Sequence, residues 1–201
     1  MTDPRTRLIM RHAEDPAAQA PVTLPIAQTT TFVIDDALDA AMDEGDYRSQ
    51  YLYTRMGNPT VRAVERRLAA LHGAADGVCT ASGMAALSAV LIGLTAPGDR
   101  ILAHTHLYGV TTSFLRRYLV PMGREVVFGD LSSGSVRDEL SEAGPFRWVL
   151  AETVSNPLLD VANLEAIRAL ADRVGAEVVV DNTFANPLGC RPIAHGADVV
   201  V

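Results

Sequence analysis

Residues 177–183 read Glu-Val-Val-Val-Asp-Asn-Thr, and this stretch decides the fold class. Three valines in succession favour a β-strand, and a strand that is apolar on both faces is typical of a sheet covered on both sides. The strand ends in Asp181, where desolvation makes a charge costly, so we expect its carboxylate to have a cationic partner. From these residues alone, an arginine partner or a cap on the following turn explains Asp181 slightly better than a bound cationic ligand does.

Runs of the same kind recur along the chain and alternate mostly with helical patterns. The other predicted strands are Gly77–Thr80, Arg100–Ala103, Glu125–Phe128, Trp148–Ala151 and Asp198–Val201. The predicted helices include Met84–Leu94, Thr112–Leu119 and Leu164–Val174. This alternation indicates an α/β fold with a mostly parallel sheet and helices on both faces. In such sheets functional groups gather at the carboxyl ends of the strands.

The pattern changes near residue 55. Residues 1–55 show little periodicity and are interrupted by Pro16, Pro21 and Pro25, which predicts an extended N-terminal arm. Residues 56–201 carry the regular pattern and are predicted to form one domain. Its first helix has Asn58-Pro59 at the start and Gly73 at the end, which are the residue types favoured at those positions.

The composition argues against several classes of partner. The chain is 48% apolar and 20% charged, and its net charge of −7 comes without a basic cluster, which predicts no nucleic-acid partner. The uncharged segment Gly77–Gly98 fits a strand, turn and helix better than a membrane span, and we find no signal peptide. Because neither a membrane span nor a signal peptide is found, we expect no membrane partner. Two cysteines, Cys79 and Cys190, without partner-like spacing suggest a reducing, cytoplasmic location.

The segment Ser82-Gly83 leads from a predicted strand directly into an Ala/Leu-rich helix. Free backbone N–H groups and the helix dipole at such a turn would suit a phosphate. The same pair is more often an ordinary helix cap, and both interpretations stay open from this segment alone.

Two further segments place polar groups at the same predicted edge. His104 and His106 could ligate zinc, but no third ligand with suitable spacing accompanies them, so we predict no metal. Tyr108 on its own is interpreted as packing, and Asn156 before Pro157 as a simple turn.

Taken together, these segments resemble the pyridoxal phosphate enzymes of cysteine and methionine metabolism, the family of cystathionine γ-synthase, cystathionine γ-lyase and methionine γ-lyase. The motifs that carry the resemblance, in the family's order and across nearly the whole chain, are Thr29-Thr30-Thr31-Phe32, Tyr53-Thr54-Arg55-Met56-Gly57-Asn58-Pro59-Thr60, Ser82-Gly83-Met84-Ala85-Ala86, Tyr108-Gly109, Glu152-Thr153-Val154-Ser155-Asn156-Pro157 and Val180-Asp181-Asn182-Thr183. The resemblance implies a truncated fold like that of aspartate aminotransferase, the type I fold, with pyridoxal 5'-phosphate as cofactor.

The resemblance also implies roles for single residues. The implied cofactor-binding residues are Tyr53, Arg55, Gly83, Met84, Tyr108, Asn156, Asp181 and Thr183. Gly83 and Met84 match the backbone donors to the cofactor phosphate, and Tyr53 and Arg55 match a pair that reaches the same phosphate across a subunit interface. Asn156 matches the residue near the ring hydroxyl.

Two of these residues are implied to be catalytic. Tyr108 matches the tyrosine that stacks on the pyridine ring and assists proton transfer. Asp181 matches the carboxylate that keeps the ring nitrogen protonated, which makes the ring an electron sink.

The chain contains no lysine, although the family's chemistry depends on one that binds the cofactor. Its last residues also resemble a strand that stops in mid-run, so we expect a truncated chain that lacks the catalytic lysine. The implied activity of the family is γ-elimination or γ-replacement in trans-sulfuration, on cystathionine, a homoserine ester or a related amino acid. The resemblance also implies a homo-oligomer, a homotetramer as in the family, whose sites are shared between subunits.

Lyase and synthase are not separable from these residues. Methionine γ-lyases resemble one another in having a cysteine after the Tyr-Gly pair, where this chain has Val110. This difference weakens an assignment as a methionine γ-lyase. The alternative is a non-catalytic fragment, or an oligomerisation partner that lends Tyr53 and Arg55 to an intact subunit. The absent lysine favours this alternative for the 201 residues, and the complete motif set favours an enzyme.

Overall fold

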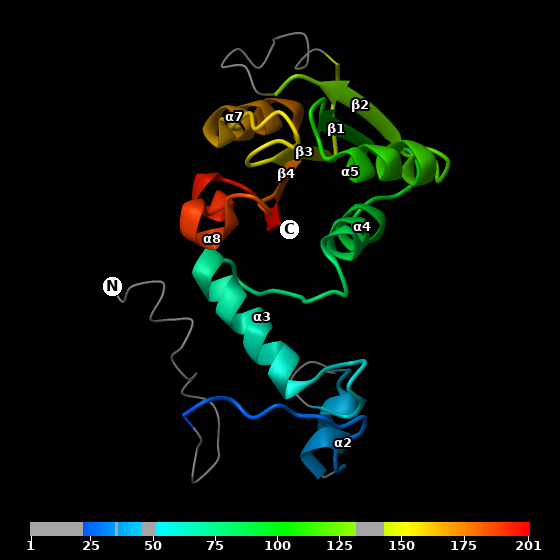
Figure 1. The fold of residues 1–201 in the computed structure, drawn as a ribbon. Helices are drawn as coiled ribbons and strands as arrows, with labels where there is room; N and C mark the ends of the chain where they lie inside the picture. The colour runs from blue at the N-terminus through cyan, green and yellow to red at the C-terminus, as the bar shows by residue number, and fades with distance from the viewer. Residues whose placement is uncertain (1–21, 35, 46–50, 132–142) are drawn as a thin grey trace. The chain divides into compact units, whose positions relative to one another are not determined.

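The computed structural model describes residues 22–34, 36–45, 51–131 and 143–201 (Figure 1). The chain divides into two compact units, Met1–Cys79 and Thr80–Val201. The second unit contains the whole of the sheet and the helices that pack on it. No helix among the described residues is long and apolar enough to cross a membrane.

The first unit includes helix α2, Asp36–Asp43, and helix α3, Pro59–His72. The side chain of Asn58 accepts a hydrogen bond from the N–H of Thr60 at 2.9 Å, and Gly73 ends α3 in the left-handed conformation, with φ of 74°. Both predicted ends of this helix are therefore confirmed. Helix α2 falls within the segment that was predicted to be extended.

The second unit is built on a parallel sheet in the order β2-β1-β3-β4-β5. Its strands are β1 Arg100–His104, β2 Glu125–Gly129, β3 Trp148–Glu152, β4 Glu177–Asp181 and β5 Val199–Val200. Because β2 and β3 lie on opposite sides of β1, the direction of winding reverses between β1 and β3. Ligands of open parallel sheets bind outside the carboxyl ends of the strands at such a switch point.

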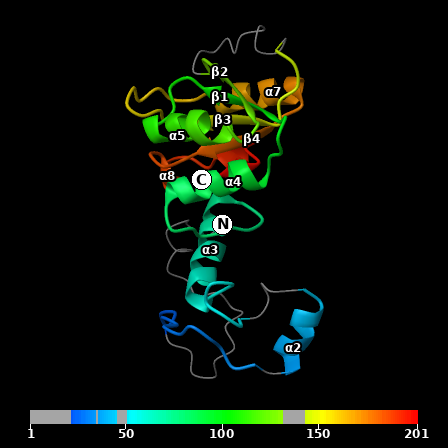
Figure 2. The same cartoon turned by 90° about the vertical axis from the view of Figure 1, so that its right-hand side faces the viewer.

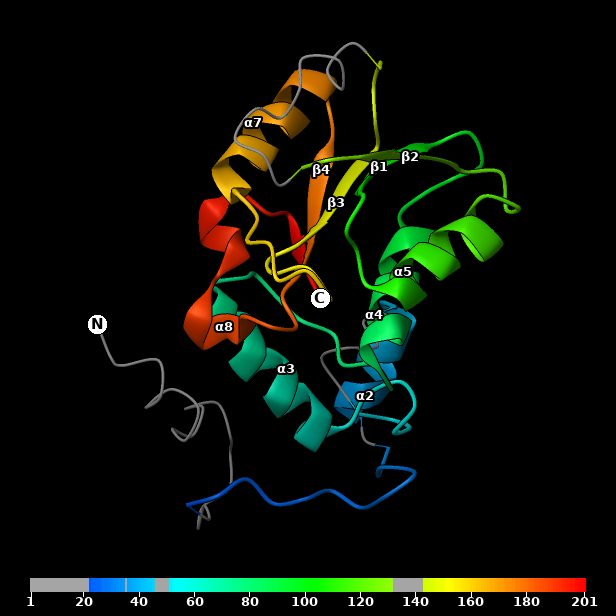
Figure 3. The same cartoon turned by 45° about the horizontal axis from the view of Figure 1, so that its top comes forward.

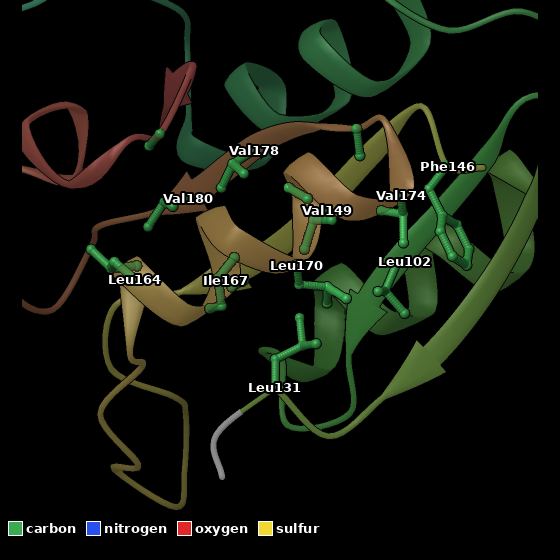
Figure 4. Close-up of a cluster of buried hydrophobic side chains, with 14 residues drawn as sticks. Leu102, Leu131, Phe146, Val149, Leu164, Ile167, Leu170, Val174, Val178 and Val180 are labelled. Carbon is green, nitrogen blue, oxygen red and sulfur yellow. The ribbon is translucent and has the colours of Figure 1, made fainter. Parts of the chain in front are cut away.

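Helix α7, Leu164–Val174, covers one face of this sheet (Figure 3). Its apolar residues recur at helical spacing, and Ile167 and Leu170 are fully buried against Leu102 and Val149 (Figure 4). Burial of each such side chain stabilises the fold by about 1.5–3 kcal/mol. Asn163 caps the start of the helix by accepting the N–H of Ala166 at 3.0 Å.

The other face is covered by α4, Gly83–Gly93, by α5, Gly109–Phe114, and by the π-helical turn η1, Leu115–Leu119 (Figures 1 and 2). Their buried leucines pack on Ile101, Trp148, Leu150 and Val179. After β4 come the short helices α8, Asn186–Gly189, and η2, Pro192–His195. An α/β fold with a parallel sheet and helices on both faces is thus confirmed.

One predicted strand is wrong, and the bounds of several other elements differ from the predicted ones. Gly77–Thr80 forms no strand, because no described strand pairs with it. The N–H of Cys79 donates to Glu65 Oε1 at 2.9 Å instead, and Val78 is 68% exposed. The last strand is only the two residues of β5. The helix predicted at Thr112–Leu119 begins three residues earlier, at Gly109.

Candidate active site

A cavity of about 420 Å³ lies at the carboxyl ends of β1, β3 and β4, and all of its lining belongs to the second unit. The lining residues are Ser82, Gly83, Met84, Tyr108, Glu152, Val154, Asn156, Asp181, Thr183 and Phe184. The volume is within the range of small-molecule sites, and the position is the switch point of the sheet. Six of the eight residues predicted to bind cofactor are therefore brought together.

The start of α4 forms one wall of the cavity. Ser82 accepts the N–H of Ala85 through its side chain at 3.1 Å, and its carbonyl accepts the N–H of Ala86 at 3.0 Å. The N–H groups of Gly83 and Met84 precede these and have no acceptor among the described residues. Two free donors at the positive end of a helix dipole therefore border the cavity, as an anion site requires.

Asp181 closes β4 and borders the cavity beside Thr183. Its Oδ1 accepts the N–H of Thr183 at 3.0 Å and the hydroxyl of the same residue at 2.5 Å. The carboxylate thus caps the following turn, and no arginine among the described residues pairs with it. Since both bonds use Oδ1, Oδ2 stays available to a cation.

Glu152 closes β3 and is only 5% exposed. It is the register partner of Asp181 in the parallel ladder, so both side chains lie on the α4 face of the sheet. Its Oε1 accepts the N–H of Tyr108 at 2.5 Å, and its Oε2 accepts the N–H of Asn156 at 3.2 Å. Burial raises the pKa of the Glu152 carboxyl, and the nearby Asp181 raises it further.

Tyr108 and Asn156 lie on either side of the switch point. Tyr108 precedes α5 and is 41% exposed, and Asn156 lies in the loop after β3. The peptide bond between Asn156 and Pro157 is cis. A polar group and an aromatic ring are thus presented at the edge that also carries the two carboxylates.

The two histidines considered as zinc ligands have other contacts. The Nδ1 atom of His104 accepts the N–H of Leu131 at 3.0 Å, and burial lowers the pKa of this imidazole. His106 lies 3.3 Å from a carboxylate oxygen of Asp160. Within the described ranges, no group of three or more metal-ligating side chains is found.

Tyr53 and Arg55 belong to the first unit. The guanidinium of Arg55 lies over the ring of Tyr53, 5.1 Å from its centroid, and Tyr53 forms an antiparallel bridge with Thr31. Arg55 borders a second cavity of about 430 Å³ within that unit. The predicted reach of this pair to a cofactor phosphate stays a prediction.

Sequence reasoning missed four lining residues as site components: Ser82, Glu152, Val154 and Phe184. The sequence offered a signal for Glu152, because it directly follows the predicted strand Trp148–Ala151, as Asp181 follows its run of valines. Its burial and its two backbone donors could not be foreseen from the order of residues alone.

The profile of the family described as "Cys/Met metabolism PLP-dependent enzyme" matches residues 5–201. Among curated proteins, the chain is 38% identical over 183 residues to an L-methionine gamma-lyase of Fusobacterium nucleatum, covering 90% of the chain and 46% of that protein. It is 36% identical over 178 residues to an O-acetyl-L-homoserine sulfhydrylase of Leptospira meyeri, covering 89% of the chain and 40% of that protein. The chain therefore spans under half the length of these relatives.

Solved structures show the same similarity. A putative O-acetylhomoserine (thiol)-lyase of Campylobacter jejuni, solved with a pyridoxyl-lysine phosphate, matches with a TM-score of 0.89 and 28% identity. A cystathionine gamma synthase of Xanthomonas oryzae, solved with aminoacrylate and cysteine, matches with a TM-score of 0.85 and 34% identity. Each match covers 100% of this chain and 49% of the other.

Proposed function

The chain belongs to the Cys/Met metabolism family of pyridoxal phosphate-dependent enzymes, and on that premise we propose that it builds the cofactor site of a sulfur amino-acid enzyme acting at the γ-carbon. The observation that carries the proposal is the convergence of Gly83, Met84, Tyr108, Asn156, Asp181 and Thr183 on one cavity. These residues come from four separate segments, and the sequence motifs predict each of them as a cofactor-binding residue.

The residues present fit a phosphorylated pyridine. The free N–H groups of Gly83 and Met84 would hold the phosphate, and the available Oδ2 of Asp181 would hold a protonated ring nitrogen. Tyr108 would stack on the ring and carry a proton, and Asn156 would bond to the ring hydroxyl. When bound, the cofactor supplies an electron sink for carbanions of the amino-acid substrate.

Support for the substrate class comes from the relatives, whose names include a methionine gamma-lyase and homoserine-ester sulfhydrylases. The proposed reactions are γ-elimination and γ-replacement, with cystathionine, a homoserine ester or a related amino acid as substrate. We further propose a cytoplasmic homo-oligomer, a homotetramer by family, in which Tyr53 and Arg55 reach the phosphate of a neighbouring subunit.

A second candidate is a non-catalytic role, as a fragment or as an oligomerisation partner of the same fold. The observations that favour it are the absence of lysine from the 201 residues and the coverage of less than half of the relatives. On this proposal, the chain has the cofactor pocket but no lysine that could bind the cofactor covalently.

The cofactor site is tested by removing one backbone donor. Gly83 is the first residue of α4, a position where proline is compatible with a helix start, so Gly83→Pro deletes the N–H and keeps the helix. We expect pyridoxal 5'-phosphate to bind Gly83→Pro about tenfold more weakly than the matched Gly83→Ala, which retains the donor. Absorbance titration measures both affinities. Equal affinities would contradict the phosphate assignment.

A further inference from the structure

Glu152 is a buried carboxylate to which the proposed function assigns no role. It lies at the carboxyl end of β3, and among the described residues it makes no ion pair with an arginine or a histidine. Burial of a carboxylate without a cation is costly, and an apolar side chain would fill the same position at lower cost. The backbone N–H groups that the two oxygens of Glu152 accept offset part of this cost.

The two oxygens of Glu152 bond to two different loops. Tyr108 follows β1, and Asn156 follows β3, so the carboxylate bridges the crevice at the switch point. Both oxygens accept hydrogen bonds from backbone N–H groups. Hydrogen bonds from backbone donors to a carboxylate are charge-assisted, and they are stronger than hydrogen bonds between neutral groups.

Both donors belong to residues with a proposed cofactor contact. Tyr108 is also held on its other side, because its carbonyl accepts the N–H of Thr112 at 3.0 Å. The side chain of Tyr108 makes no cap bond to α5, so its backbone determines where the ring is presented. The backbone of Asn156 is likewise fixed by Glu152 Oε2 next to the cavity.

We propose that Glu152 is a positioning residue that sets the placement of Tyr108 and Asn156 across the switch point by accepting the N–H of both. Its value for catalysis rests on the proposed function, whereas the bridge itself does not. Glutamine offers one acceptor oxygen in place of two, and aspartate is one methylene shorter, so neither replaces it.

The bridge is tested by hydrogen exchange of the 201-residue chain, with Glu152→Gln compared with Glu177→Gln. Glu177 lies at the opposite end of the β3–β4 ladder, where it pairs with Arg147 at 2.9 Å on the surface. We expect peptides that contain the amides of Tyr108 and Asn156 to exchange about tenfold faster in Glu152→Gln, and peptides from α7 to be unchanged. Glu177→Gln should leave both loops unchanged.

Unchanged exchange in both loops would overturn the proposal, as would acceleration spread evenly over the second unit, since that pattern reports a general loss of stability. If Glu152→Gln does not fold, Glu152→Asp decides the question, because it retains the charge. Faster exchange in at least one loop supports the bridge, and full protection of both loops overturns it.

A pyridoxal 5'-phosphate titration of the same proteins separates this inference from the proposed function. Binding to the wild-type chain with about tenfold weaker binding to Glu152→Gln supports both. If Glu152→Gln binds the cofactor as tightly as the wild-type chain and exchange is unchanged, the bridge is contradicted and the proposed cofactor site is not. Accelerated exchange in both loops without any binding by the wild-type chain leaves the bridge standing and contradicts the proposed cofactor site.

Discussion

At the scale of the residue, the two carboxylates that end neighbouring strands serve different purposes. One oxygen of Asp181, Oδ1, accepts hydrogen bonds from the turn that follows it, and the other, Oδ2, is available to the cavity. Glu152 uses both oxygens on backbone donors. Because the two are register partners on the same face, a cation bound at Asp181 would also be favoured by the charge of Glu152.

The role of Asp181 predicts a separation of activity from binding. In a longer chain that supplies the lysine, Asp181→Ala should retain most of the cofactor and lose activity by a far larger factor, because the ring nitrogen loses its anionic partner. Asp172→Ala is the control, since Asp172 lies on α7 and pairs with Arg168 on the surface. Release of 2-oxobutanoate and cofactor content measure the two effects. Parallel losses of both would contradict the role.

The burial of Glu152 predicts a dependence of stability on pH. Because burial raises the pKa of Glu152 in the folded chain, the folded state binds this proton more tightly than the unfolded state does. The stabilisation from that proton is complete below the ordinary pKa of glutamate and is lost as pH rises through the raised pKa.

The free energy of unfolding of the wild-type chain, relative to Glu152→Gln, should therefore fall over that pH range. Fluorescence of Trp148, the single tryptophan, reports unfolding of the strand that carries Glu152. A difference that rises with pH would show that the carboxylate is stabilised by its two backbone donors more than it is destabilised by burial.

Sequence reasoning found Asp181 and missed Glu152 for a physical reason. A carboxylate that ends a run of valines stands out, and the resemblance gave it a role. Glu152 follows an equally apolar run, but its function depends on donors 44 residues earlier and four residues later in the chain. Contacts of that kind depend on which strands become neighbours.

At the scale of the element, α4 forms part of both the sheet packing and the proposed cofactor pocket. Its start lines the cavity, and its buried Leu87 and Leu91 pack on the sheet. The pattern of strand, Ser-Gly and helix predicted the helix and its cap correctly. The strand expected before it was wrong: the described strands do not pair with residues 77–80, and the N–H groups of Gly77 and Cys79 donate to side chains.

Two helix caps provide a matched comparison. Ser82 caps α4 beside the cavity, and Asn163 caps α7 on the other face of the sheet. Replacement of either by alanine should reduce stability by about 0.5–2 kcal/mol. Only Ser82→Ala should also weaken binding of pyridoxal 5'-phosphate, because fraying of the first turn misplaces the N–H groups of Gly83 and Met84. Urea unfolding and absorbance titration test this, and equal binding by the two variants would count against it.

At the scale of the whole molecule, the order of strands explains why one cavity gathers residues from so many segments. Parallel strands separated by helices place the loops after β1, β3 and β4 at one edge. The alternation of apolar runs was enough to predict this class of fold. The chain spans under half the length of the curated relatives that it matches, so the activity of the whole protein stays a proposal.

The absence of lysine predicts that the 201 residues have no γ-lyase or γ-synthase turnover by themselves. Release of 2-oxobutanoate from cystathionine or an O-acyl-homoserine is the assay. Turnover that persists after rigorous removal of host enzymes would show that another group replaces the lysine.

The proposed sharing of sites between subunits predicts complementation in a longer chain that carries the lysine. Arg55→Ala and Asp181→Ala subunits should each be impaired, and mixing them should restore part of the activity in hybrid sites that have both residues. If subunit exchange is demonstrated and no activity returns, Arg55 serves its own chain.

We propose above all that this chain builds a pyridoxal phosphate pocket at the switch point of its sheet. A crystal structure of the chain with pyridoxal 5'-phosphate tests it most directly. We expect the phosphate to bond to the N–H groups of Gly83 and Met84, and the ring nitrogen to face Asp181 Oδ2 beside Tyr108. A phosphate bound elsewhere, or a ring nitrogen directed away from Asp181, would contradict it.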